Sequence, residues 1–261
     1  MIPVNVDWLI GIVSTWMLLS MRLVGCFLVM PLLSFRALPL RSRLLMALVL
    51  AYAVLPSIQG RYVVSTDLAS ASYGVAVIEL AIGMAAGWVV RVGLMAFDLL
   101  AEVISVETGL SFASTYFRDP SLASGLAGEF IGLLALAIAF TLNIHLVFLD
   151  VIFSSYQTLP PGTWPASWNW PSVLTLVAKS FSFGVVLSLP VIVLYLMLNM
   201  TQAVLARVSP QLNLFSIGFA IFVPVAFLVL AIVIPSFAET VQRALEPAFE
   251  WIRAGVARPS R

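Results

Sequence analysis

The chain has few charged residues. Asp, Glu, Lys and Arg make up 10% of its 261 residues, whereas hydrophobic residues make up 62%. A soluble domain carries about 25% charged residues, because its surface has to be hydrated. A surface as poor in charge as this one must face lipid or other apolar protein. The composition therefore excludes an ordinary soluble enzyme and predicts an integral membrane protein.

Cysteine and histidine are almost absent as well. The chain has one of each, Cys26 and His145, which excludes an intrachain disulfide and a multi-histidine metal site. The formal net charge of +1 does not provide the basic surface that nucleic acid requires. We therefore expect no metal, no other cofactor and no nucleic-acid partner.

Familiar catalytic motifs are missing too. The sequence contains no Gly-x-Ser-x-Gly elbow, no phosphate-binding glycine-rich loop and no His-Glu-x-x-His pair. An intramembrane enzyme built around His145, Asp150 and Asn143 is disfavoured, because one histidine without a nucleophile is a poor catalytic set. The first residues lack the basic region and the cleavage site of a secretory signal, so we expect 8–33 to be part of the mature protein. We predict that the chain is not an enzyme.

Long hydrophobic segments dominate what is present. A helix needs about 20 apolar residues to cross a membrane, and no ten-residue alternation typical of a membrane barrel appears. The sequence predicts an all-α membrane protein with about six hydrophobic helical segments. Basic residues divide equally between alternate loops, so they predict no orientation. The six segments are 8–33, 44–58, 75–97, 126–149, 172–206 and 212–238.

The breaks between these segments have distinct compositions. Residues 157–171 combine prolines with tryptophans and no charge, which favours a loop at the membrane–water interface. Residues 207–213 form a short polar stretch between two apolar arms, and we predict a helical hairpin whose turn uses Arg207, Pro210, Gln211 and Asn213. Residues 239–261 mix charged and apolar residues at helical spacing, which predicts a short surface helix and tail.

Glycines recur at helical spacing in two segments. Glu79, Gly83, Gly87 and Arg91 follow one another every four residues and share a helix face. Gly128 and Gly132 form a second such face. Small residues spaced by four let two helix backbones approach closely, so both faces predict tight packing, within the chain or with partners.

Acidic residues follow the first glycine face. Asp98 and Glu102 lie on the same helix face as Arg91, and Glu107 comes just before a break at 109–120. Ionisable groups at membrane depth are costly unless they are paired or hydrated. Two interpretations stay open: the stretch emerges into water with Asp98 paired to Arg91, or it forms an acidic wall beside a water-filled or protein-conducting path.

The break itself carries three aromatic residues, Phe112, Tyr116 and Phe117. A non-helical loop at membrane depth has to be buried in protein or line a cavity, and apolar rings in a pore resist wetting. A surface loop fits the composition equally well.

Three segments resemble a known family: Glu107–Ala113, the Leu159–Gly162 turn and Leu189–Phe219, with its Arg-x-x-Pro-Gln-x-Asn-x-Phe-x-x-Gly-Phe pattern. Together they resemble the FliR family, the R subunit of the flagellar export gate. The resemblance extends from about Arg36 to Pro235. The chain departs from the family at Ala220, where a proline is common, and at Glu107-Thr108, where Gln-Met is common.

The resemblance implies a structural and gating subunit of the bacterial flagellar type III protein export gate. It implies one membrane domain, 1–238, whose FliP-like portion is followed by a FliQ-like hairpin at 175–238, and then the surface helix and tail 239–261. The implied partners are FliP-like and FliQ-like subunits, with which the chain forms the export pore. The resemblance also implies contacts with FlhB-like and FlhA-like components, with membrane lipid and with unfolded flagellar proteins in transit. The implied location is the flagellar basal body in the bacterial inner membrane.

Site residues follow from the same resemblance. The loop is expected to act as a plug in the pore, through Gly109, Leu110, Ser111, Phe112, Tyr116 and Phe117. The acidic face of Asp98, Glu102 and Glu107 is then expected near the pore. The competing hypothesis is a stand-alone ion-coupled transporter that uses Arg91 and these three acidic residues.

Overall fold

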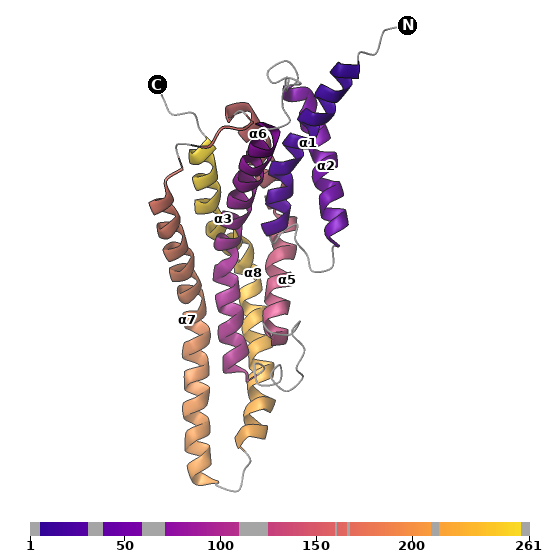
Figure 1. The fold of residues 1–261 in the computed structure, drawn as a ribbon. Coiled ribbons are helices and arrows are strands. Elements are labelled where there is room, and N and C mark those ends of the chain that lie inside the picture. The colour runs from indigo at the N-terminus through magenta and orange to yellow at the C-terminus, as the bar shows by residue number, and fades with distance from the viewer. Residues whose placement is uncertain are drawn as a thin grey trace. The chain divides into compact units, whose positions relative to one another are not determined.

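The computed structural model describes most of the chain as helix (Figure 1). The described residues are 6–30, 39–58, 71–109, 125–159, 161–165, 168–209 and 214–256. Every regular element within these ranges is an α-helix, which confirms the predicted all-α fold. The helices are α1 (Val6–Val29), α2 (Leu40–Ile58), α3 (Ala71–Glu107), α5 (Gly125–Thr141), α6 (Ile144–Thr158), α7 (Trp170–Val208) and α8 (Leu214–Val256).

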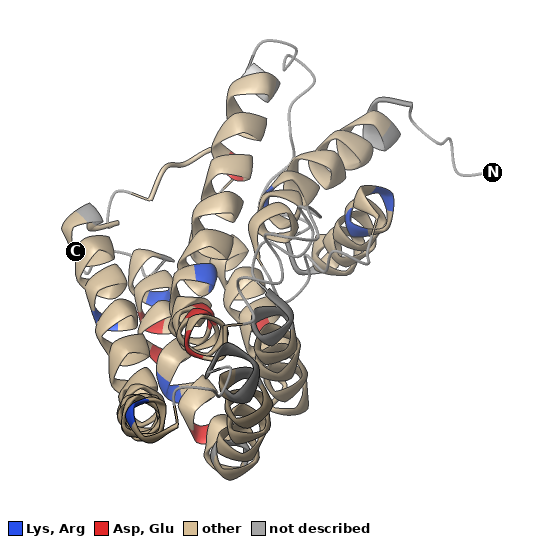
Figure 2. Cartoon of the chain, turned by 90° about the horizontal axis from the view of Figure 1, so that it is seen from below, with Lys and Arg blue, Asp and Glu red and all other residues tan. Residues whose placement is uncertain are grey.

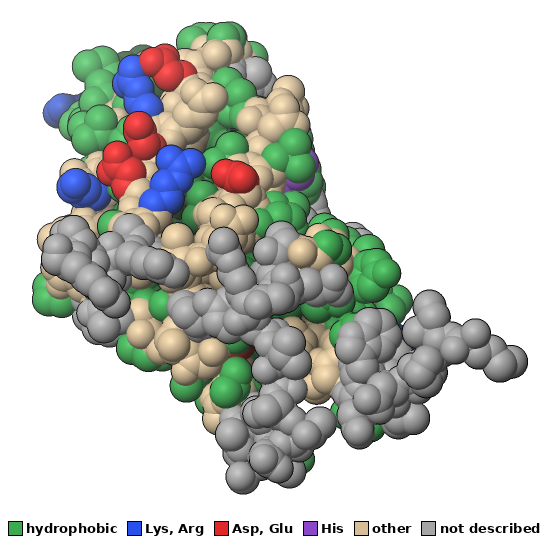
Figure 3. Space-filling view, turned by 90° about the horizontal axis from the view of Figure 1, so that it is seen from above, with side chains coloured by type: hydrophobic (Ala, Val, Ile, Leu, Met, Phe, Trp, Pro, Cys, Tyr) green, Lys and Arg blue, Asp and Glu red, His purple; other side chains and the backbone are tan. Residues whose placement is uncertain are grey.

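Among the described residues, three stretches of helix are long and apolar enough to cross a membrane: Ile10–Val29, Tyr73–Glu107 and Pro171–Val208. Two bent helix pairs raise this number to as many as 5 if each pair is one span. Figure 2 shows how few positions along the helices carry charge, and Figure 3 shows the hydrophobic side chains that surround charged ones on one face. The predicted hydrophobic membrane helices are therefore confirmed.

The segment predicted at 126–149 is not one straight helix. Phe130–Thr141 and Ile144–Thr158 meet at an angle of 66°, because Asn143 adopts the left-handed conformation with φ 56° and ψ 26°. Asparagine tolerates that conformation better than most residues, and a helix cannot continue through it. The apolar composition on both sides concealed this break.

The predicted surface helix at 239–261 is the end of a longer helix. Helix α8 continues through this region to Val256 and bends beside Pro235. Phe237, Val241 and Leu245 are buried along one side, whereas Glu239 and Arg243 form an exposed ion pair one turn apart on the other. This stretch is amphipathic as predicted, but its apolar side is buried within the chain.

The chain forms two compact units, which we describe separately. The first unit comprises Met1–Val92, Asn143–Thr175 and Glu246–Arg261, and the second comprises Gly93–Leu142 and Leu176–Leu245. In the first unit, Trp16 of α1 donates a hydrogen bond through Nε1 to the Leu48 carbonyl of α2 at 2.9 Å.

The second unit contains the predicted helical hairpin. The Tyr195 hydroxyl of α7 donates to the Phe222 carbonyl of α8 at 2.7 Å, and the two rings meet edge to face at 5.4 Å. Closer to the turn, Gln202 packs against Gly218, where an added Cβ would lie 3.2 Å from Gln202 Nε2. Contacts at 195/222 and 202/218 require antiparallel arms, as the sequence predicted.

Candidate functional site

A buried ion pair joins α1 and α3 in the first unit. Arg22 donates from Nε to Glu79 Oε2 at 2.7 Å and from Nη2 to Glu79 Oε1 at 3.0 Å. Neither side chain has any exposed surface. Two parallel charge-assisted hydrogen bonds of this kind are strong, and they fix the orientation of the two side chains relative to each other.

Further donors and acceptors surround the pair. Arg22 Nη1 donates to Ser155 Oγ of α6 at 2.8 Å, and Glu79 Oε1 accepts the Gly162 backbone N–H at 3.0 Å. The guanidinium carbon lies 4.4 Å from the centre of the Tyr156 ring. The Tyr156 hydroxyl donates in turn to the Leu19 carbonyl of α1 at 2.7 Å. The network thus ties α1, α3, α6 and the turn after α6 together.

Three glycines bring the backbones of α1 and α3 into contact beside this pair. A Cβ added at Gly83 would lie 1.9 Å from the Arg22 carbonyl oxygen, and one at Gly25 would lie 2.3 Å from the Leu80 carbonyl oxygen. A Cβ at Gly87 would lie 2.8 Å from the Cys26 carbonyl oxygen. No side chain fits at these positions, so the close approach depends on glycine.

The sequence anticipated part of this arrangement. It placed Glu79, Gly83 and Gly87 on one face for close packing, and the structure puts that face against α1. It missed Arg22, Gly25, Ser155 and Tyr156. The available signal was two opposite charges, Arg22 and Glu79, each inside an apolar stretch, since such charges usually pair at membrane depth.

The network is suited to holding helices together. Its charged groups, Arg22 and Glu79, are paired with each other. The Tyr156 hydroxyl donates to a backbone carbonyl, and the Ser155 hydroxyl donates to the backbone and accepts from Arg22. Within the described ranges, no group of three or more His, Cys, Asp or Glu side chains could hold a metal ion. We interpret it as the structural centre of the first unit.

The predicted acidic face lies on the last turns of α3, in the second unit. Asp98 and Glu102 are exposed and Glu107 is half-buried. Gly109 follows with φ 74°, and its N–H bonds to the Val106 carbonyl at 3.0 Å, so α3 ends at the predicted break. The other predicted plug residues lie outside the described residues: Leu110, Ser111, Phe112, Tyr116 and Phe117.

Gly132, in the second glycine face, has surroundings that differ from those of Gly83 and Gly87. Gly128 and Gly132 both lie in α5. Around Gly132, no atom of the described residues comes within 4 Å of an added Cβ. The first glycine face therefore packs within the chain, whereas the described part of the chain leaves room beside Gly132.

The hairpin turn is described only in part. Arg207 lies exposed in the last turn of α7, and the Ser209 N–H bonds to the Leu205 carbonyl at 2.9 Å. Pro210, Gln211 and Asn213 lie outside the described residues.

The proline- and tryptophan-rich loop is anchored to the end of α8 in the first unit. Trp168 is 6% exposed, and its ring lies 5.0 Å from that of Trp251, whose Nε1 donates to Ser172 Oγ at 2.7 Å. A Cβ at Gly255 would lie 1.8 Å from Trp168 Nε1. Trp164, by contrast, is 47% exposed. One tryptophan assigned to a membrane interface is thus a core residue, because the same ring is favoured in both places.

Known proteins match this chain over most of its length. A family model described as "Bacterial export proteins, family 1" matches residues 13–248. The flagellar biosynthetic protein FliR of Escherichia coli (strain K12) is 31% identical over 240 residues, which cover 90% of this chain and 88% of that protein. FliR of Caulobacter vibrioides is 29% identical over 221 residues, covering 83% and 87%. FliR of Bacillus subtilis (strain 168) is 23% identical over 249 residues, covering 94% and 95%. These matches extend through both compact units, and the chain therefore belongs to the bacterial export proteins, family 1.

Proposed function

We propose that the chain is a structural and gating subunit of the flagellar type III protein export gate. In this proposal it forms, with FliP-like and FliQ-like subunits, the pore through which unfolded flagellar proteins leave the cell. Family membership supports the coarser statement that it is a membrane component of the flagellar export apparatus. We place it in the bacterial inner membrane, beside FlhB-like and FlhA-like components.

The observation that carries the proposal is the uncovered apolar surface of α7. Only 22% of the most apolar stretch of α7 is buried within the chain, compared with 50% of the corresponding stretch of α1. Met197, Val204 and Val208 near the hairpin turn are 65%, 66% and 75% exposed. A face this apolar has to be covered by other protein or by lipid. We infer that FliP-like and FliQ-like subunits cover this end of the hairpin.

The ion-pair network supports a scaffold role. An ion-coupled transporter needs sheltered ionisable groups that change their charge state or bind an ion. In the first unit the sheltered charges, Arg22 and Glu79, are committed to each other. In the second unit Asp98 and Glu102 are exposed. No observation on the described residues favours the transporter. The test below distinguishes it from the export-gate subunit.

The test compares the chain made alone with the chain made together with FliP-like and FliQ-like subunits. Alone, we expect degradation or aggregation, because the α7 face and the space beside Gly132 stay uncovered. With its partners, we expect a monodisperse hetero-complex whose mass in native mass spectrometry exceeds that of this chain several-fold. A monodisperse, protease-resistant monomer or small homo-oligomer obtained without partners would contradict the proposal and favour the transporter.

A matched pair of variants makes the test specific for α7. Met197→Glu with Val204→Glu adds charge to the face assigned to partners and should abolish co-purification. Val49→Glu with Tyr52→Glu adds the same charge to exposed positions of α2, which are 68% and 66% exposed, and should leave the complex intact. Equal loss in both double variants would mean that α7 has no special role in assembly.

A further inference from the structure

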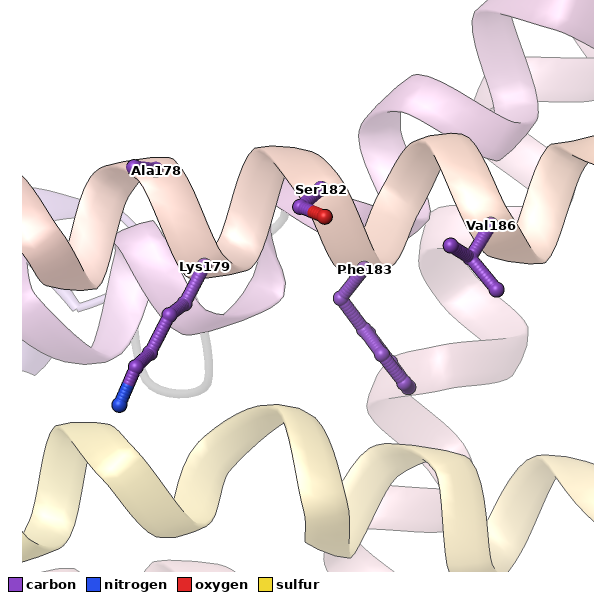
Figure 4. Close-up of a pocket in the computed structure, with 5 residues that line it drawn as sticks. All are labelled: Ala178, Lys179, Ser182, Phe183 and Val186. Atoms are coloured by element: carbon purple, nitrogen blue, oxygen red, sulfur yellow. The ribbon is translucent and has the colours of Figure 1, made fainter.

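A shallow, open groove lies along the first half of α7, in the second unit. Its volume is about 460 Å³, and it is lined by Ala178, Lys179, Ser182, Phe183 and Val186. Figure 4 shows these side chains on successive turns of the helix. The exposed apolar residues assigned above to partner subunits, Met197, Val204 and Val208, lie further along α7, closer to the hairpin turn.

Two polar groups in the groove have nothing to bind within the described chain. Lys179 is the only lysine in the sequence, and its side chain is exposed. Among the described residues, neither its ammonium group nor the Ser182 hydroxyl one turn later makes a hydrogen bond or an ion pair. The Lys179 side chain extends toward the N-terminal end of α7 in Figure 4, as helical side chains generally do.

Apolar side chains continue from these groups along the same helix face. Positions 179, 182, 186 and 189 share one face by their spacing. Val186 is 59% and Leu189 47% exposed, and Phe183 lines the groove between them and Lys179. At 1.5 Å per residue, Lys179 to Leu189 extends about 15 Å along the axis, which is about half of a hydrocarbon core about 30 Å thick. The face thus has a cation at one end and an apolar stripe after it, and the two together extend about as far as one leaflet.

We propose that this groove binds an anionic phospholipid. The Lys179 ammonium group pairs with the lipid phosphate, the Ser182 hydroxyl donates a hydrogen bond to a phosphate oxygen, and one acyl chain lies against Phe183, Val186 and Leu189. A lysine whose stem lies on apolar surface while its ammonium reaches the headgroup level suits this contact. A soluble anion would leave the apolar stripe uncovered, and an apolar protein surface would leave the Lys179 charge unpaired.

The experiment measures which lipids stay with the full-length chain. The chain is extracted from cell membranes within its assembled complex, in polymer-bounded lipid discs, and exchanged into discs of phosphatidylglycerol or phosphatidylcholine. A photoactivatable phosphatidylglycerol, present in trace amount, marks the residues it contacts. We expect crosslinks in the peptide that contains Ser182–Leu189, and about fivefold less crosslinking when phosphatidylcholine carries the photoactivatable group.

Variants assign the contact to Lys179. Lys179→Gln should reduce crosslinking of phosphatidylglycerol about fivefold, whereas Lys179→Arg keeps the charge and should retain most of it. Arg91→Gln removes an exposed cation from α3 and serves as the matched control, with crosslinking unchanged. Equal crosslinking of the two lipids, or full retention by Lys179→Gln, would overturn the proposal. Competition by inorganic phosphate as strong as that by phosphatidylglycerol would also overturn it, since the site would then be an anion site that does not recognise lipid.

Discussion

Arg22 and Glu79 hold each other through two hydrogen bonds, of 2.7 and 3.0 Å, while both side chains are completely buried. Taking two charges out of water is costly, and a buried pair offsets that cost only with good geometry and with its other bonding groups satisfied. Ser155, Gly162 and the Tyr156 ring supply those contacts. The pair also fixes how α1 lies against α3, because two parallel bonds allow one register only.

Removing one member of this pair should be far worse than removing both. Glu79→Gln or Arg22→Met leaves an uncompensated buried charge and should destabilise the chain by about 3–5 kcal/mol, whereas the double variant should be destabilised less than either single variant. Thermal unfolding in mild detergent, with the amount of chain retained in membranes as a second readout, measures this double-mutant cycle.

The exposed pair Glu239 and Arg243 provides the control, since it has the same chemistry one turn apart on α8. Glu239→Gln and Arg243→Met should each change stability by less than about 0.5 kcal/mol. If the Arg22 and Glu79 variants behave like these, the buried pair does not hold α1 to α3.

Glycine should be required at Gly83 and dispensable at Gly132. Gly83→Ala places a methyl group where the Arg22 carbonyl lies and should destabilise the first unit by about 1–3 kcal/mol or more. Gly132→Ala has open space within the described chain and gains up to about 1 kcal/mol of helix propensity. Melting temperatures of the two variants should move in opposite directions. A fall of equal size in both would show that Gly132 also contacts protein.

Trp168 should contribute far more stability than Trp164. Trp168→Ala empties a buried site between Trp251 and Gly255 and should cost about 3–5 kcal/mol. Trp164→Ala removes a half-exposed ring that meets Trp168 edge to face at 5.8 Å and should cost about 1 kcal/mol. Limited proteolysis at the C-terminal end of α8 provides the measurement, with faster cleavage expected in Trp168→Ala only. Similar cleavage rates in the two variants would contradict a core role for Trp168.

Deleting Leu110–Phe117 should open the assembled gate. The proposed plug closes the pore with Phe112, Tyr116 and Phe117, since apolar rings resist wetting. We expect the complex to assemble with normal mass and to conduct ions or small solutes in a planar bilayer, where the unmodified complex does not. The transporter hypothesis predicts loss of flux instead. Unchanged or reduced conductance in the deletion would remove the plug assignment.

Features that depend on local spacing could be predicted from the sequence. Glu79, Gly83 and Gly87 follow one another every four residues, so their shared face is a property of any helix. The hairpin follows from two long apolar arms with a few polar residues between them. These predictions need no knowledge of which helix is the neighbour.

Features that depend on a distant neighbour could not be predicted. Arg22 and Glu79 are 57 residues apart. The periodicity of a sequence predicts which face of a helix is buried, but it does not predict which other helix packs against that face. Nor does composition distinguish the buried Trp168 from the exposed Trp164. At Asn143 a single residue in the left-handed conformation bends an otherwise uniform apolar stretch, and a hydrophobicity pattern averages over one residue.

The ion pair has a consequence for synthesis in the cell. Arg22 is made 57 residues before Glu79 and 133 residues before Ser155. At roughly 5–20 residues per second, Arg22 therefore waits about 3–11 seconds for its counter-ion. During this time the first helix carries an unneutralised guanidinium that costs about 2.5–3.5 kcal/mol near the middle of a membrane. We therefore expect α1 to enter lipid at low energy only after α3 has been made and Glu79 can pair with Arg22.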